Sequence, residues 1–214
     1  MHTQSGRTSV AAARRLMRPL FVMRSLLFAF LVLATASCRV GGPRTPAEAH
    51  ARLSSAVAAH DSVMLWNALD QDTRWSWMAI QRAWRECYDI TQSVVPEGPE
   101  RARLLGRFEA GATSENASSL FAKMLAPEDW ATTQALLTAA GARLPETAPS
   151  GETSEIATPA GTLVYHKARD HHWGWGFSGF AARAEQTKRT ASADLDRMRS
   201  DAADYERAAT RGAR

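Results

Sequence analysis

The sequence predicts a mainly helical α+β protein, in which a helical N-terminal part packs on a small antiparallel sheet and a long helix ends the chain. Apolar residues recur at spacings of three and four between residues 45 and 140, which is typical of helices. Alternation typical of strands appears only later, in a hairpin near residues 162–178. Helical spacing then returns from Ala181 to about Ala209. These three observations define the fold class.

The chain begins with a segment that has the form of a secretion signal. In Met23–Cys38 (MRSLLFAFLVLATASC), Arg24 supplies a positive charge, and an uncharged apolar run follows up to small residues. The run is shorter than the roughly 18 to 20 apolar residues that cross a bilayer. We therefore predict a signal peptide over residues 1–37, with Met17 or Met23 as alternative start sites.

The end of this signal resembles the lipobox of bacterial lipoproteins, in the string Ala34-Thr35-Ala36-Ser37-Cys38. The resemblance implies that Cys38 receives a diacylglyceryl group and becomes the mature N-terminus. Several acyl chains together hold a protein firmly on a membrane. Arg39 stands where the inner-membrane retention signal of such proteins has Asp, which implies a periplasm-facing protein of the outer membrane. Ordinary cleavage after Ala36 and release into the periplasm is the alternative.

The charge balance argues against nucleic-acid binding. Five of the 26 Lys and Arg residues lie at or before Arg24 and none of the 22 acidic residues does, so the remainder carries 21 basic and 22 acidic residues. A domain of that charge lacks the basic surface that binds phosphates. If Cys38 is acylated, Cys87 is the only remaining thiol and no intramolecular disulfide forms.

A Gly/Pro-rich tether over residues 38–44 leads into a single α+β domain over residues 45–180. Thr45 as N-cap, Pro46 at the first helical position and Glu48 in the first turn predict a helix that extends to about Ala59.

Two further helices follow. Asp61 caps a short one, and after a turn at Asp70–Thr73 a longer one opens at Asp72 or Thr73. Four residues of the short helix are predicted to point inward: Met64, Leu65, Ala68 and Leu69. The longer helix carries an apolar face of Trp77, Ile80, Trp84 and Cys87.

The string from Thr45 to Trp75, TPAEAHARLSSAVAAHDSVMLWNALDQDTRW, resembles the opening helices of the NTF2-like (SnoaL-like) superfamily, and the likeness extends over residues 45–86. It implies a cone-shaped α+β domain of a kind that often follows lipoprotein signals. In that family a curved sheet comes next, whereas here more helix is predicted. These helices are Glu100–Glu109, Ser118–Leu125 and Pro127–Ala140, the last one ended by Gly141.

The strand region follows a surface loop at Leu144–Thr153. We predict strands at 154–158, 162–167 and 173–178, with a turn at Arg169–His171 between the last two. The third strand places Trp173, Trp175 and Phe177 on one face, either as a platform for an apolar or sugar ligand or as core packing. The other tryptophans, on helical stripes, are predicted to be core: Trp66, Trp75, Trp77, Trp84 and Trp130.

Other candidate sites are weaker. His166, His171 and His172 are the only cluster of metal-ligand type, but their spacing matches no zinc pattern, and a hydrated turn flanked by His is the alternative. Cys87 sits on an apolar helix face, which predicts a buried, inert thiol. Glu128 and Asp129 look like first-turn helix charges.

The C-terminal helix over residues 181–214 carries one apolar seam: Ala191, Leu195, Met198, Ala202, Tyr205 and Ala209. The seam predicts a helix lying along the domain, or a coiled-coil contact with another chain. No hydrolase, protease or nucleotide motif is present and no cofactor is expected. The sequence thus favours a non-enzymatic envelope lipoprotein that binds a partner protein or a small apolar ligand. A small NTF2-like enzyme acting on a hydrophobic substrate is the alternative.

Overall fold

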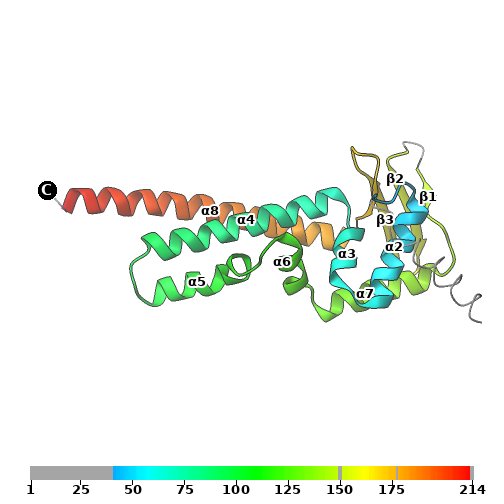
Figure 1. The fold of residues 1–214 in the computed structure, drawn as a ribbon, viewed down its shortest axis with the longest axis horizontal. Helices are drawn as coiled ribbons and strands as arrows, with labels where there is room; N and C mark the ends of the chain where they lie inside the picture. Colours follow the sequence, from blue (N-terminus) through cyan, green and yellow to red (C-terminus); the bar gives the residue numbers. More distant parts are fainter. Residues whose placement is uncertain (1–40, 149–150, 177, 213–214) are drawn as a thin grey trace, which may run out of the picture. The chain divides into compact units, whose positions relative to one another are not determined.

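The computed structural model describes residues 41–148, 151–176 and 178–212. Within these ranges it contains seven helices and one four-stranded antiparallel sheet, which confirms the predicted fold class (Figure 1). The helices are α2 (Pro46–Ala59), α3 (Ser62–Ala68), α4 (Gln71–Val94), α5 (Pro99–Ala112), α6 (Ala117–Met124), α7 (Pro127–Ala140) and α8 (Ser178–Gly212). The strands are β1 (Glu146–Thr147), β2 (Thr153–Thr158), β3 (Gly161–Lys167) and β4 (Trp173–Trp175).

The predicted helix caps are present, with one correction. The Thr45 hydroxyl accepts the Glu48 amide, and the Asp61 carboxylate accepts the amides of Val63 and Met64. The turn predicted at Asp70–Thr73 is wrong, because α4 already begins at Gln71. The Asp70 carboxylate accepts the Thr73 amide at 2.8 Å, and so satisfies a free donor of the first helical turn.

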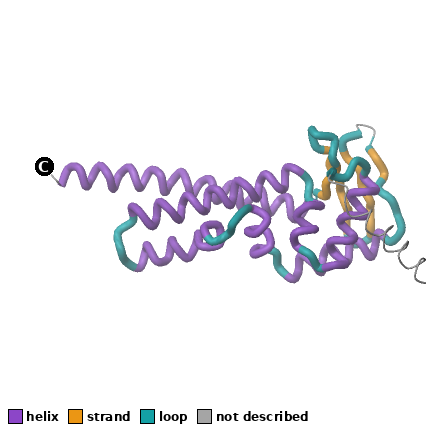
Figure 2. Tube along the Cα trace, in the orientation of Figure 1, coloured by secondary structure: helices purple, strands orange, loops and turns teal. Residues whose placement is uncertain are grey.

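The sheet runs in the order β1-β2-β3-β4. Its strands are drawn in orange in Figure 2. The loop predicted at Leu144–Thr153 needs correction, since it contains the short strand β1, in which Glu146 lies opposite Glu155. The third strand is also shorter than predicted, because it ends at Trp175 and α8 begins at Ser178. A turn joins β3 to β4 as expected, with His171 in the left-handed region at φ 64°.

The main core lies between the sheet and helices α2, α3, α4, α6 and α7. Its largest fully buried side chains include Trp175, Tyr165, Phe121, Leu53, Leu65, Leu69, Ile80, Leu120, Leu136 and Leu163. Trp77 is buried there, and Trp66, Trp84 and Trp130 are partly buried against it. Trp75 was predicted to be core, but it is 51% exposed because it lies off the stripe of α4 that faces inward.

Helix α8 lies along α4, and α5 packs on α4 beside it (Figure 1). A second apolar cluster forms there around Cys87, Phe108 and Met198. Ala191 and Met198 of the predicted seam are buried, whereas Tyr205 is 46% exposed. The prediction of a helix lying along the domain is therefore confirmed for the first part of the seam.

Candidate functional site

The candidate site centres on a carboxylate–imidazole pair at the start of α4. Oδ2 of Asp70 lies 2.6 Å from Nδ1 of His166 on β3, while Oδ1 of Asp70 accepts the Thr73 amide. The Asp70 side chain is 5% exposed and that of His166 is 45% exposed. One partner is therefore fixed inside the protein, and the other reaches the surface.

Two glycines make room for this pair. A Cβ atom at Gly176 would lie 2.4 Å from Nδ1 of His166 and 2.5 Å from Oδ2 of Asp70, and one at Gly174 would lie 2.4 Å from Cα of Asp70. Real side chains do not approach so closely. The close approach also allows the Asp70 amide to donate to the Trp175 carbonyl at 2.9 Å. Glycine is therefore required after both tryptophans of β4.

Two hollows border His166, with volumes of about 370 and 190 Å³. Both hollows are lined by Asp70, Asp72, His166 and Lys167. The larger one also reaches Ser76 on α4, Glu152 before β2 and Glu185 on α8, and the smaller one reaches Trp75 and Arg169. We call the two hollows together the His166 groove.

The charges around the groove act on the imidazole. The hydrogen bond to Asp70 raises the pKa of His166 despite its partial burial, and the charges of Asp70, Asp72 and Glu155 raise that pKa further. On the α8 side, the hydrogen bond from Lys188 lowers the pKa of Glu185. The rim thus carries several carboxylates but also Lys167 and Arg169.

The aromatic platform, one of the two alternatives for the third predicted strand, is not open to a ligand at its first two positions. Trp173 is 6% exposed and Trp175 is fully buried, so both belong to the core. The core-packing alternative is therefore confirmed for these two residues. Phe177 lies outside the described residues.

The three histidines considered as metal ligands have separate environments. His166 pairs with Asp70, whereas Nδ1 of His172 lies 3.1 Å from Oδ2 of the exposed Asp170 in the β3–β4 turn. His171 is exposed in the same turn. In the described part of the chain, no group of three or more His, Cys, Asp or Glu side chains is arranged to hold a metal ion.

Two further predicted residues have different outcomes. Cys38, the predicted lipidation site, lies outside the described residues. Cys87 is fully buried, as its apolar helix face predicted.

Sequence reasoning missed Asp70, because it was placed in a turn, and it missed the role of Gly174 and Gly176, because they appeared only to separate aromatic residues. The capping position of Asp70 before an amphipathic helix was the available signal.

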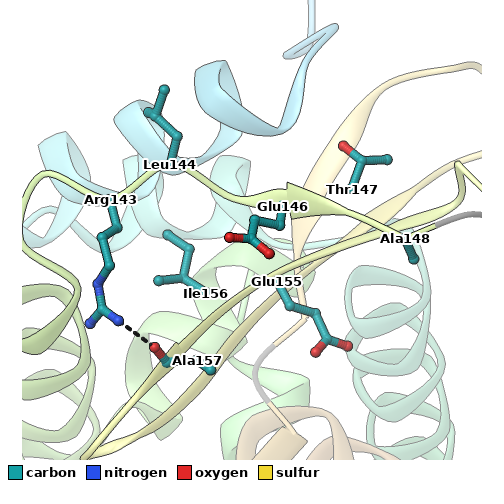
Figure 3. A pocket seen from close by; sticks show the side chains of 8 residues that line it. All are labelled: Arg143, Leu144, Glu146, Thr147, Ala148, Glu155, Ile156 and Ala157. Carbon is teal, nitrogen blue, oxygen red and sulfur yellow. Dashed lines mark hydrogen bonds between the residues drawn. The ribbon is translucent and has the colours of Figure 1, made fainter.

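A hollow larger than those of the His166 groove lies elsewhere, between the segment that precedes β2 and β2 itself, with a volume of about 700 Å³ (Figure 3). Arg143 lines it, but its guanidinium already donates to the carbonyls of Ala139, Ala140 and Ala157. The carboxylates there, Glu146 and Glu155, are exposed. Without a buried titratable side chain to position a ligand, this hollow is a weaker candidate than the His166 groove.

No protein-family model, curated protein or solved structure matches the chain. Among the helices that the structure describes, none combines the length and the apolar character needed to cross a membrane.

Proposed function

We propose that this chain is a lipid-anchored protein of the bacterial cell envelope, whose folded domain binds a ligand or a partner protein. The observation that carries the anchor is the segment Met23–Cys38, a charged start and an apolar run that end in a lipobox-like cysteine. By the same resemblance, Arg39 after the cysteine favours the outer membrane over the inner one.

The start of the folded domain fits a short tether. Pro43 is buried, and its carbonyl accepts the Trp173 amide at 2.8 Å. Five peptide bonds separate Cys38 from Pro43, and an extended chain of that length spans at most about 18 Å. A lipid on Cys38 would therefore hold the domain near a bilayer surface.

The His166 groove is the proposed binding site. Its lining of carboxylates, an imidazole and a lysine suits a polar ligand, or a polar segment of a partner. An apolar ligand on Trp173 and Trp175, one of the two sequence-based alternatives for these residues, is not part of the proposal because both side chains are buried. A small enzyme is the second candidate, and the observation that favours it is the buried carboxylate of Asp70 on a half-exposed imidazole.

Intact-mass measurement on membrane-extracted protein tests the anchor. We expect a mature chain that begins at Cys38 and carries acyl groups, and we expect Cys38→Ser to lack them and to leave the membrane fraction. A chain that begins elsewhere, or wild-type protein that washes freely from membranes, would contradict the proposal.

Mass spectrometry of co-purifying molecules from the wild-type protein and from Asp72→Lys, which reverses a charge on the groove rim, tests the binding site.

A further inference from the structure

We propose that Asp70 and His166 form a catalytic proton-transfer pair, which activates water against a small polar ester bound in the His166 groove. The inference rests on the groove as the ligand site, as proposed above, and it is independent of the lipid anchor.

The pair has the polarity that a general base requires. Because the Asp70 carboxylate only accepts hydrogen bonds, the neutral imidazole carries its proton on Nδ1 and donates it to Asp70. Nε2 then keeps its lone pair. Among the residues that the structure describes, none forms a hydrogen bond with Nε2, and the half-exposed ring borders both hollows. A molecule in the groove can therefore give a proton to Nε2.

Several contacts hold the Asp70 carboxylate in place. Oδ1 of Asp70 is fixed by the Thr73 amide, and the Asp70 amide is fixed by the Trp175 carbonyl. Gly176 leaves just enough space for the other oxygen to meet the imidazole. Because such a base is already oriented, it loses little conformational freedom when a substrate binds.

Two other histidines of the chain lack either the access to solvent or the buried partner that His166 has. His50 is buried, 9% exposed, so a substrate cannot reach it. His172 also pairs with an aspartate, but Asp170 is exposed in a turn. Only His166 among these three joins a buried carboxylate to an open ring edge, and His172 is its matched control.

The reaction balances with water as the second substrate. Nε2 of His166 takes a proton as the water oxygen bonds to the acyl carbon, and the imidazolium is stabilised by the negative charge of Asp70. The bond from that carbon to the alcohol oxygen then breaks, and the proton on Nε2 passes to this leaving oxygen. The products are an acid and an alcohol, and the pair returns to its first state.

The groove also limits the substrate. Its hollows of about 370 and 190 Å³ suit a small molecule. The carboxylates of Asp70, Asp72 and Glu152 line the larger hollow with Lys167, and Glu185 lines it too but is paired with Lys188 and Arg189. An ester that is neutral or carries a positive charge is therefore favoured over an anionic one.

The test uses the mature full chain in detergent, with p-nitrophenyl acetate as a neutral probe and mono-p-nitrophenyl succinate as an anionic one. Loss of a general base costs about 10²- to 10⁴-fold, so we expect His166→Gln to remove most of the protein-dependent hydrolysis. His172→Gln should stay within about twofold of wild type. The neutral probe should be hydrolysed faster than the anionic one, relative to their rates in buffer.

Two variants separate catalysis from folding. Asp70→Asn keeps an acceptor for the Thr73 amide but removes the charge, so the midpoint of the pH–rate profile should fall toward the ordinary pKa of histidine. Gly176→Ala keeps both titratable groups but places a Cβ between them, and it should lose activity as His166→Gln does. Gly106→Ala, where nothing lies near a new Cβ, is the control.

Circular dichroism accompanies each assay. Folded His166→Gln protein that hydrolyses the probe as fast as wild type would overturn the proposal. An equal loss in His172→Gln, or an unchanged pH midpoint in folded Asp70→Asn, would do the same. A failure of the intact-mass experiment on Cys38 would leave these outcomes unaffected, so the two proposals fail separately.

Discussion

Nδ1 of His50 lies 2.6 Å from the hydroxyl of Tyr165, and this pair joins helix α2 to strand β3 inside the core. Both side chains are buried, with exposed fractions of 9% and 0%. Burial lowers the pKa of His50 and raises that of Tyr165. The fold therefore requires a neutral imidazole at residue 50 and a neutral phenol at residue 165.

The His50 imidazole makes the protein less stable in acid. Because the pKa of His50 is lower in the folded than in the unfolded protein, the unfolded protein binds a proton more readily, and the free energy of unfolding falls as the pH drops below about 6.5. Urea unfolding of wild type and His50→Gln between about pH 8 and about pH 5 measures this effect. Gln does not titrate, so the variant should lose less stability over this range. Equal losses would refute the prediction.

His166 acts in the opposite direction. Its pKa is raised in the folded protein, mainly by the hydrogen bond to Asp70, so its stabilising contribution is fully present at low pH and is lost as the pH rises through the folded pKa. His166→Gln should therefore steepen the acid loss of stability that His50→Gln reduces. In the double variant neither imidazole remains, so neither should contribute to the pH dependence of the free energy of unfolding. Urea midpoints across the same pH series provide the measurement.

The Tyr165 hydroxyl should matter more than its size suggests. Tyr165→Phe leaves a buried nitrogen of His50 without its partner, which costs about 1–3 kcal/mol of unfolding free energy. Tyr205→Phe is the control, because Tyr205 is 46% exposed on α8. Chemical denaturation of both variants provides the comparison, and equal small effects would show that the His50 contact contributes nothing.

Two glycines of α5 should respond oppositely to alanine. A Cβ at Gly111 would lie 2.4 Å from Cβ of Trp84 on α4, so Gly111→Ala forces the two helices apart and costs about 1–3 kcal/mol. Nothing lies within 4 Å of a Cβ at Gly106, where alanine should stabilise the helix by up to about 1 kcal/mol. Thermal unfolding of both variants should give shifts of opposite sign.

The thiol of Cys87 should not react in the folded protein. Burial, together with the charges of Asp194 and Glu86, raises its pKa to about 11, so little thiolate forms near neutral pH. In the Cys38→Ser variant, a thiol-specific disulfide reagent should therefore react only after urea is added. Rapid reaction without urea would show that the α4–α5–α8 cluster opens readily.

The sequence was most informative where a local physical rule decides the outcome. Thr45, Asp61 and Gly141 were correctly predicted to bound helices, because capping depends on residues within one turn. Tertiary contacts are not visible in this way. Asp129 was predicted as a first-turn charge, and its carboxylate does accept the Ala126 amide, but it is also buried and paired with Arg183 of α8.

The same limit explains the candidate site. His166 was visible as a histidine near a turn, but its partner lies 96 residues earlier in the chain. Periodicity cannot report a pair that forms only when β3 meets the start of α4. Trp75 shows the converse, since its residue type suggested a core position that the facing of α4 does not provide.

The alternation of tryptophan and glycine in residues 173–176 therefore has a second meaning. The aromatic rings at 173 and 175 are buried in the core, and smaller apolar side chains in their place would leave cavities but cause no clash. The hydrogen atoms that stand in place of side chains at 174 and 176 have no substitute among the amino acids. In a homologous chain that keeps the aspartate and the histidine, we expect glycine at both of these positions. A larger residue at either position would indicate a chain in which the hydrogen-bonded pair does not form.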